Sequence, residues 1–434
     1  MRCDVAIVGA GISGLACAAA LSGYGIPAVL FEARDIVGGR IRTYRPPDGG
    51  PALELGAQVI HGDRNPLRDL AGDGIPAAES PRSQLVPRTA AARAVLHGRI
   101  TPLGALARGG MPPWVVEQRL TADGGGQADG RAGGRSREGA DGLGHDGHDD
   151  IPVASWLAEQ RIAGDHLLAA AEWFRQNWAA EPQALSARGV AAARRGDQTG
   201  DGEYAFEDGY LSLTDTLAAA LDIRLGKPVR TLAWAPGRVE LRTGDGAHAT
   251  ARAAVITAPP PVIAGERLAI APMPEHKSAA ARALPSGDGL CAVATLSRAA
   301  SESAVVFDAD GQGGFVRCTA GRPEVLIVAK ARAAAAVRAA NLADLVGRVF
   351  PRWTAPEVIG MQVADWGHNP WSAGVFSYPG VGAGWAGPAW AAPVQRTLFF
   401  AGEATTAALL PPTVHGALSS GLRAASEIVE AWGR

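Results

Sequence analysis

The N-terminal segment contains the feature that most narrows the folds open to this chain. Residues 3–8 form a mainly apolar run short enough for a buried strand, and Gly9, Gly11 and Gly14 follow in G-x-G-x-x-G spacing. The alanine-rich pattern of residues 13–22 then predicts a helix. A glycine turn that opens a helix presents free N–H groups to a pyrophosphate. We therefore predict a dinucleotide site; an ordinary βαβ glycine turn is the alternative.

The residues after this turn narrow the choice of nucleotide. Gly9 permits the tight turn, Gly11 lets the backbone approach a pyrophosphate, and Gly14 lets the helix pack close to the strand. Residues 28–31 read as a second strand, and Glu32 follows Gly9 by 23 residues, where an acid reaches a ribose hydroxyl. An acid there disfavours the 2′-phosphate of NADP but leaves NAD and FAD open.

Composition excludes several function classes. A chain of 434 residues with 47% hydrophobic and 19% charged residues is globular and long enough for two or more domains. The net charge of −2 without a basic patch predicts no nucleic-acid partner. No apolar run is long enough to span a bilayer, and no secretory signal precedes the first strand, so we expect a cytoplasmic protein without membrane contact. Four scattered cysteines predict neither a disulfide framework nor a zinc site.

Residues 122–150 differ from the rest of the chain. Ten of these 29 residues are glycine and most others are charged, so the segment cannot repay the entropy of ordering. We predict a flexible surface insertion. Its His and Asp cluster could in principle bind a metal, but a solvated loop is favoured and no metal is predicted. That cluster consists of His145, Asp146, His148, Asp149 and Asp150.

The segment after the second strand and three distant places in the chain carry a resemblance to a known family. Gly38, Gly39 and Arg40 lie just beyond the second strand, and "LELGAQVIHG" (53–62) adds another small-residue turn. Together with distant segments, this arrangement resembles the flavin-containing amine oxidase family, which includes monoamine and polyamine oxidases, L-amino-acid oxidases and flavin histone demethylases. The distant segments are "KPVRTLAW" with "RAAVITAPPPVI" (227–234, 252–263), "DWGHNPWSAGVFSYPG" (365–380) and "LFFAGEATTAALLPPTVHGALSSGLRAA" (398–425).

The resemblance implies an α/β architecture in which two domains are interleaved along the chain. A Rossmann-like FAD-binding domain is expected from residues 1–75, 205–265 and 385–434. A substrate-binding domain, a mixed sheet with helices, is expected from residues 76–204 and 266–384.

The same resemblance implies the cofactor and its contacts. FAD is expected to bind non-covalently, because Val375 stands where a covalently flavinylated member has cysteine. A helix beginning near Val414 aims its positive end at the flavin ring. His415, next on that helix, is expected to point away. The expected FAD contacts are Gly9, Gly11, Ile12, Ser13, Gly14, Glu32, Ala33, Arg34, Gly38, Gly39, Arg40, Gly56, Ala57, Gln58, Val59, Val229, Ala258, Pro259, Trp366, Gly402, Glu403, Thr413, Val414 and Ala417.

The implied reaction is oxidation of a C–N bond in a small-molecule amine or amide. A hydride equivalent moves to flavin N5, the product is an imine, and O2 reoxidises the flavin to give H2O2. Two alternatives stay open: a C–C desaturase of the same fold, and a flavin-binding scaffold that has lost catalysis. Oligomeric state is not indicated by the sequence.

This chain departs from the family near the expected reaction centre. The family's lysine follows a glycine by four residues; here Gly287 plus four is Cys291, and neither Lys277 nor Lys330 fits the pattern. Cys291 is interpreted as a small core residue; the alternatives are a redox or nucleophilic thiol beside the flavin, and a misalignment with the family's lysine position. The departure favours a specialised substrate, as in natural-product tailoring and secondary metabolism.

Three further residues complete the predicted catalytic set. Trp366 and Phe376 are the aromatic candidates, with core packing as the alternative, while the second family ring position is Thr413. His61 is expected to contact substrate or transfer a proton, or else to be an ordinary hydrogen-bonded histidine.

Overall fold

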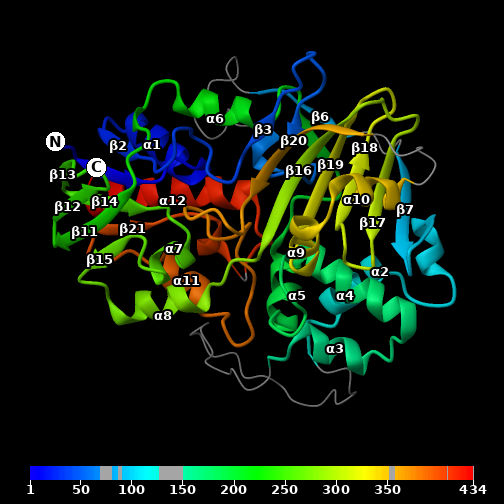
Figure 1. The fold of residues 1–434 in the computed structure, drawn as a ribbon. Helices are drawn as coiled ribbons and strands as arrows, with labels where there is room; N and C mark the ends of the chain where they lie inside the picture. The colour runs from blue at the N-terminus through cyan, green and yellow to red at the C-terminus, as the bar shows by residue number, and fades with distance from the viewer. Residues whose placement is uncertain (69–80, 87–89, 127–149, 351–356, 408, 434) are drawn as a thin grey trace.

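Two sheet-based lobes lie side by side in the computed structural model (Figure 1), which describes residues 1–68, 81–86, 90–126, 150–350, 357–407 and 409–433. One lobe holds a parallel sheet and both chain termini; the other holds a larger, mainly antiparallel sheet and a cluster of helices. The predicted α/β class is confirmed. The domain boundaries given above stay predictions, and residues 127–149 of the expected insertion lie outside the described residues.

A five-stranded parallel sheet organises the first lobe. Four of its strands are short apolar runs that are buried almost throughout, as expected when both faces of a sheet are covered, whereas the fifth, at an edge, is largely exposed. Side chains alternate between the faces: Val5 and Ile7 pack toward α1 and α12, whereas Ala6 and Val8 pack toward a second sheet. In sheet order the strands are β10 (Asp222–Arg224), β2 (Ala28–Phe31), β1 (Val5–Val8), β14 (Ala253–Ile256) and β21 (Leu398–Phe400).

The two faces of this sheet are covered differently. Helices α1 (Ile12–Gly23) and α12 (Val414–Ala431) run together along one face, with α6 (Leu211–Ala218) beside them (Figure 1). The other face packs against a four-stranded sheet and three short helices. These are β13 (His248–Ala251), β12 (Arg238–Thr243), β11 (Val229–Ala235) and β15 (Ala269–Ala271), with α7 (Pro260–Ala264), α8 (Glu275–Ala283) and α11 (Ala386–Ala391).

A seven-stranded sheet organises the second lobe. All neighbours pair antiparallel except β17 and β7. One face of the sheet packs on α9 (Arg332–Ala339) and α10 (Leu342–Val349), and the other face looks toward the first lobe. In sheet order the strands are β20 (Val358–Asp365), β16 (Gly289–Leu296), β19 (Glu324–Lys330), β18 (Phe315–Cys318), β17 (Ala304–Asp308), β7 (Ala91–Leu96) and β8 (Arg99–Pro102).

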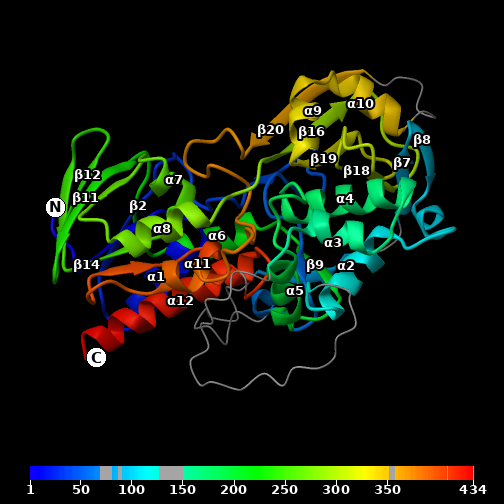
Figure 2. The same cartoon turned by 90° about the horizontal axis from the view of Figure 1, so that it is seen from below.

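A helical cluster in the second lobe and two small sheets complete the described fold. The helices share a core around Trp156, Phe174 and Trp178, and lie beneath the large sheet as seen in Figure 2. They are α2 (Pro113–Ala122), α3 (Val153–Glu159), α4 (Gly164–Trp178) and α5 (Ala187–Gly196). The small sheets pair β3 (Thr43–Tyr44) with β4 (Leu53–Glu54), and β9 (Glu203–Phe206) with both β5 (Ile60–His61) and β6 (Ser83–Leu85).

Two negative findings apply to the part of the chain that the structure describes. None of its helices combines the length and apolar character needed to cross a membrane. No group of three or more His, Cys, Asp or Glu side chains gathers there as a metal site. The four cysteines are all free thiols.

Candidate active site

A cavity of about 980 Å³ extends from the glycine turn of the first lobe to the seven-stranded sheet of the second. Every residue expected to contact the cofactor lines this cavity except Gly14. His61, Cys291, Trp366 and Phe376, which come from three separate segments, line it too. The fold therefore gathers the candidate residues around one space.

The glycine turn is shaped for close backbone approach. Gly9 has φ +107°, and a Cβ there would lie 2.4 Å from Thr257 Oγ1. A Cβ on Gly14 would lie 2.1 Å from the carbonyl oxygen of Gly9, so Gly14 acts in helix–strand packing rather than in the cavity wall. No side chain caps the N-terminus of α1, whose N–H groups stay available. This cradle fits a pyrophosphate.

Glu32 has a structural task beside its expected one. The side chain is buried, and its carboxylate accepts hydrogen bonds from the backbone N–H of Ala10 (2.8 Å) and of Arg34 (3.0 Å). These two hydrogen bonds tie the glycine turn to the segment that follows β2, at the wall of the cavity. Its contact with a ribose stays a prediction.

Three distant segments meet at Glu403. One carboxylate oxygen accepts from Arg40 Nη1 at 2.8 Å and from Ser377 N at 3.1 Å, and the other accepts from Ser377 Oγ at 2.6 Å. Glu403 is 7% exposed, so this ion pair is held away from bulk water. The pair fixes Arg40 at the cavity wall, where a phosphate would find a positive charge.

The N-terminus of α12 forms another part of the wall. Thr413 caps the helix by accepting from Gly416 N at 3.2 Å. His415 is buried and lines the cavity instead of pointing away: its Nδ1 lies 3.0 Å from Asn65 Nδ2, an amide donor. Burial lowers the pKa of His415, so the ring is neutral near pH 7. The expectation that it points away is wrong because Asn65 holds it inward.

His61 lies at the end of β5 and is exposed within the cavity. The surrounding walls reduce its hydration and lower its pKa. A neutral imidazole can accept a proton or a hydrogen bond from a bound molecule. Its role as a catalytic residue stays a prediction.

The aromatic and cysteine candidates differ in environment. Trp366 is buried and donates from its indole nitrogen to the carbonyl of Leu55 at 2.8 Å. Cys291 packs in the same small core cluster, with Gln58 Nε2 3.8 Å from its sulfur. Burial raises the pKa of the Cys291 thiol to about 12, so it stays protonated at neutral pH. This supports the packing interpretation of Cys291 over the reactive one.

Three cavity-lining residues carry no recognisable signal in the sequence: Asn65, Arg317 and Lys330. Lys330 is brought beside Cys291 by the pairing of β16 with β19, in which Gly289 faces Lys330 and Cys291 faces Val328. Sequence spacing from Gly287 could not find it, because the lysine comes from the neighbouring strand. Only strand alternation places residues 326, 328 and 330 on one face.

Comparisons with known proteins agree with this geometry. The sequence profile of the family described as flavin containing amine oxidoreductase matches residues 12–429. Polyamine oxidase 3 of Oryza sativa subsp. japonica is 29% identical over 466 residues, covering 97% of this chain and 88% of that protein. Lysine-specific histone demethylase 1 homolog 3 of Arabidopsis thaliana is 26% identical over 98% of this chain but only 30% of its own length.

A solved structure shares the fold over its whole length. Cyclohexylamine oxidase from Brevibacterium oxydans IH-35A superposes with a TM-score of 0.76 at 21% identity, covering 100% of both chains. At that identity the likeness shows the fold alone.

Proposed function

Because this chain belongs to the flavin-containing amine oxidoreductase family, with FAD as its cofactor, we propose that it is an amine oxidase that passes electrons to O2. The observation that carries the proposal is the single cavity that joins the glycine turn to an aromatic end beneath the large sheet. One end fits a dinucleotide and the other leaves room for a small molecule.

The chain's own residues support this reaction in defined ways. The glycine turn and α1 would hold the pyrophosphate, Arg40 would add a positive charge held in place by Glu403, and α12 would direct its positive end at the flavin ring. FAD, when bound, takes a hydride equivalent from the carbon beside the amine nitrogen. Val375 offers no nucleophile, which supports non-covalent binding.

Other residues prepare the substrate rather than the cofactor. Trp366 and Phe376 give the cavity apolar walls that exclude water. The amine must lose its proton before oxidation, and the neutral rings of His61 and His415 are candidates to accept it. We propose His61 for this role, because His415 is already held by Asn65.

We further propose a specialised substrate in secondary metabolism and a cytoplasmic location. The neutral, buried Cys291 in place of the family's lysine supports a substrate different from that of general amine oxidases. Four free thiols suit a reducing compartment.

A peroxide-release screen on the purified yellow protein tests the proposal. Amines, amino acids and amide-bearing metabolites are supplied in air, and products are identified by mass spectrometry. The expected result is peroxide with an imine or its hydrolysis product. Anaerobic bleaching by a substrate without peroxide in air would instead indicate a desaturase. A protein that binds FAD, is reduced by light and reoxidised by air, yet is bleached by no compound, would be a scaffold.

A further inference from the structure

Lys330 is placed where it can meet the substrate. It is the last residue of β19, and its side chain shares a face of the large sheet with Leu326 and Val328. All three line the cavity. The Lys330 ammonium lies 5.4 Å from the centre of the Phe376 ring, at the aromatic end of the site.

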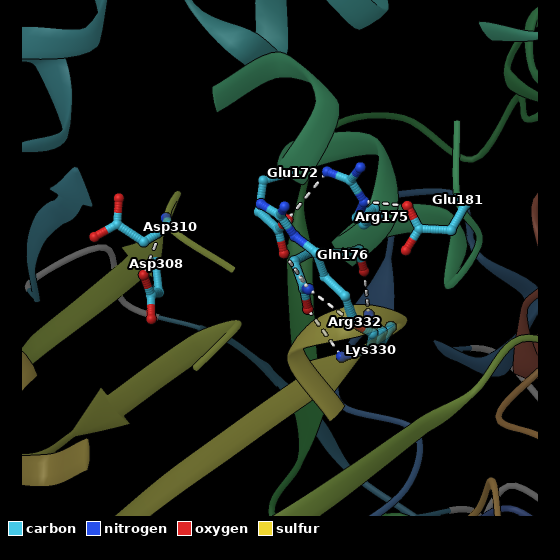
Figure 3. Close-up of polar contacts among 8 residues, drawn as sticks. All are labelled: Glu172, Arg175, Gln176, Glu181, Asp308, Asp310, Lys330 and Arg332. Carbon is cyan, nitrogen blue, oxygen red and sulfur yellow. Dashed lines mark hydrogen bonds and ion pairs between the residues drawn. The ribbon is translucent and has the colours of Figure 1, made fainter. Parts of the chain in front are cut away.

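Gln176, in the last turn of α4, holds Lys330 at three points (Figure 3). Its backbone carbonyl accepts from Lys330 Nζ at 2.5 Å. Its side-chain amide accepts from Lys330 N at 3.1 Å and donates to Lys330 O at 3.0 Å. The lysine is therefore fixed in position rather than free to turn out to solvent.

The charge of Lys330 has no counter-ion in the part of the chain that the structure describes. Glu172 is the carboxylate that Gln176 reaches, and it is already occupied by Gln176 Nε2 (2.8 Å), Arg332 Nε (2.8 Å) and Arg175 Nη1 (3.3 Å) (Figure 3). Of the three donors on the ammonium, one has a protein acceptor. Enclosing a cation whose N–H donors lack acceptors costs free energy unless an anion accepts hydrogen bonds from them.

The face of the large sheet that carries Leu326, Val328 and Lys330 forms one wall of the cavity. The neighbouring strand β18 adds a second cation to this wall. Arg317 on β18 pairs in register with Leu326 and lines the cavity, and its guanidinium forms no ion pair or hydrogen bond with any described residue. Residues 326 and 330 are separated by about 13 Å along the strand. Between the two cations the wall is apolar, formed by Leu326, Val328 and Phe315.

The charged side chains that the large sheet contributes to this wall are all positive. Among the described residues that the large sheet contributes to the cavity lining, none is acidic. The acidic lining residues outside the cofactor end, Asp197, Asp201 and Glu203, come from the segment between α5 and the start of β9. The groups around Lys330 from other elements are the Cys291 thiol, the Phe376 ring and the neutral His61, so none of them supplies an anion.

We propose that this wall selects an amine that also carries a carboxylate, with Lys330 as the main partner of that carboxylate and Arg317 reinforcing it. The inference rests on the proposed amine oxidase function and names its substrate class. A polyamine would instead place a second ammonium against a positive wall, which disfavours it. A carboxylate would accept charge-assisted hydrogen bonds from the unused donors of Lys330.

Binding of non-oxidisable probes to the oxidised FAD-bound enzyme tests this without turnover. Hexanoate, hexanamide and hexylammonium are titrated by calorimetry, with the flavin absorbance recorded in parallel. Hexanoate is expected to bind at least about tenfold more tightly than hexanamide, as a charged hydrogen bond requires. In turnover, 6-aminohexanoate is expected to be preferred over hexylamine.

Variants assign the preference to residues. K330M is expected to lose at least about tenfold in hexanoate affinity, and R317M to lose less. K330Q keeps an N–H donor of nearly the same length but removes the charge, so it is expected to behave as K330M if the charge matters. K330R is expected to retain the preference. K227M removes an exposed lysine paired with Asp245 and is expected to change nothing.

The outcomes separate this inference from the proposed function. If hexanoate binds no more tightly than hexanamide, or if K330M and K330Q lower only thermal stability, Lys330 is a helix cap and the inference is wrong, although amine oxidation stands. If K330M alters the flavin spectrum but not hexanoate affinity, its partner is FAD and the inference is again wrong. If hexanoate binds through Lys330 but no amine is oxidised, the anion site stands and the proposed oxidase does not.

Discussion

Two enclosed lysines, Lys277 and Lys330, occupy similar local settings in the two lobes and differ in one respect. Lys277 on α8 donates to the carbonyls of Ala389 (2.8 Å), Trp390 (2.8 Å) and Ala392 around the end of α11, and lies 4.0 Å from the centre of the Phe400 ring. Lys330 likewise donates to a carbonyl at a helix end, that of Gln176.

The difference lies in how many donors are satisfied. Lys277 is fully buried in the core and all three of its donors have carbonyl acceptors, whereas Lys330 has one acceptor and faces a cavity. The protein therefore supplies acceptors for all the N–H donors of the lysine in the first lobe and for only one donor of the lysine in the second. A lysine with unused donors at a cavity wall points to a ligand, and one with all donors used points to packing.

The largest expected effect concerns Lys277, whose three donors all have acceptors. Lys277→Met removes the donor from three carbonyls around the end of α11, of which that of Trp390 is buried, and we expect a loss of roughly 3 kcal/mol in the free energy of unfolding. Urea denaturation of the holoenzyme measures it. Hexanoate affinity of the folded fraction should match that of the native protein. A stable variant, or one with weakened hexanoate binding, would remove the distinction between the two lysines.

The next effect is the pH dependence of anion binding. Enclosure lowers the pKa of Lys330 to about 8, so the amine is charged and hexanoate affinity is full below that pH. Above pH 8 the free enzyme loses this proton, and binding must restore it, so affinity should fall about tenfold per pH unit. Calorimetry between pH 6 and 10 checks the sign. In K330M the curve should be flat across this range.

A smaller effect is expected when the support of Lys330 is removed. Gln176→Leu breaks two hydrogen bonds to the Lys330 backbone and one to Glu172, and should cost about 1–2 kcal/mol of stability. Hexanoate affinity should fall, but by less than in K330M, because the charge is still present. Equal affinity losses in the two variants would mean that the position of the ammonium matters as much as its charge.

The smallest effect is expected at Cys291. The thiol is buried and protonated, so Cys291→Ala should cost about 1 kcal/mol of stability through lost packing. Hexanoate affinity and the rate of flavin reoxidation should not change. A clear change in the rate of flavin reoxidation would show that the Cys291 thiol takes part in the chemistry, and would contradict the packing interpretation.

The cofactor half of the site could be predicted because its signals are local. The apolar runs and the glycine turn predicted β1, α1 and β2 to within about two residues, since each element is set by its own sequence. Thr413 as the residue before α12 was likewise readable from its motif. In these segments each signal is a run of neighbouring residues, although the segments themselves meet only in the fold, as Arg40 and Glu403 do.

The substrate half could not be predicted in the same way. Lys330 meets Cys291 only through the register of two strands, and Asn65 holds His415 across 350 residues. Alternation along β18 and β19 separates two faces of the sheet, but the sequence does not say which face looks into a cavity. Arg317 therefore reads as an ordinary surface arginine until the fold is known.

The pairing of Arg40 with Glu403 has a consequence for biosynthesis. The two residues are separated by 363 positions, and α12 packs so closely on α1 that a Cβ at Gly421 would lie 2.1 Å from the Ser13 carbonyl oxygen. A ribosome produces the glycine turn long before the residues of β21 and α12 that complete its surroundings. We therefore expect FAD to be captured only after β21 and α12 have been synthesised, and a chain interrupted before β21 to be colourless.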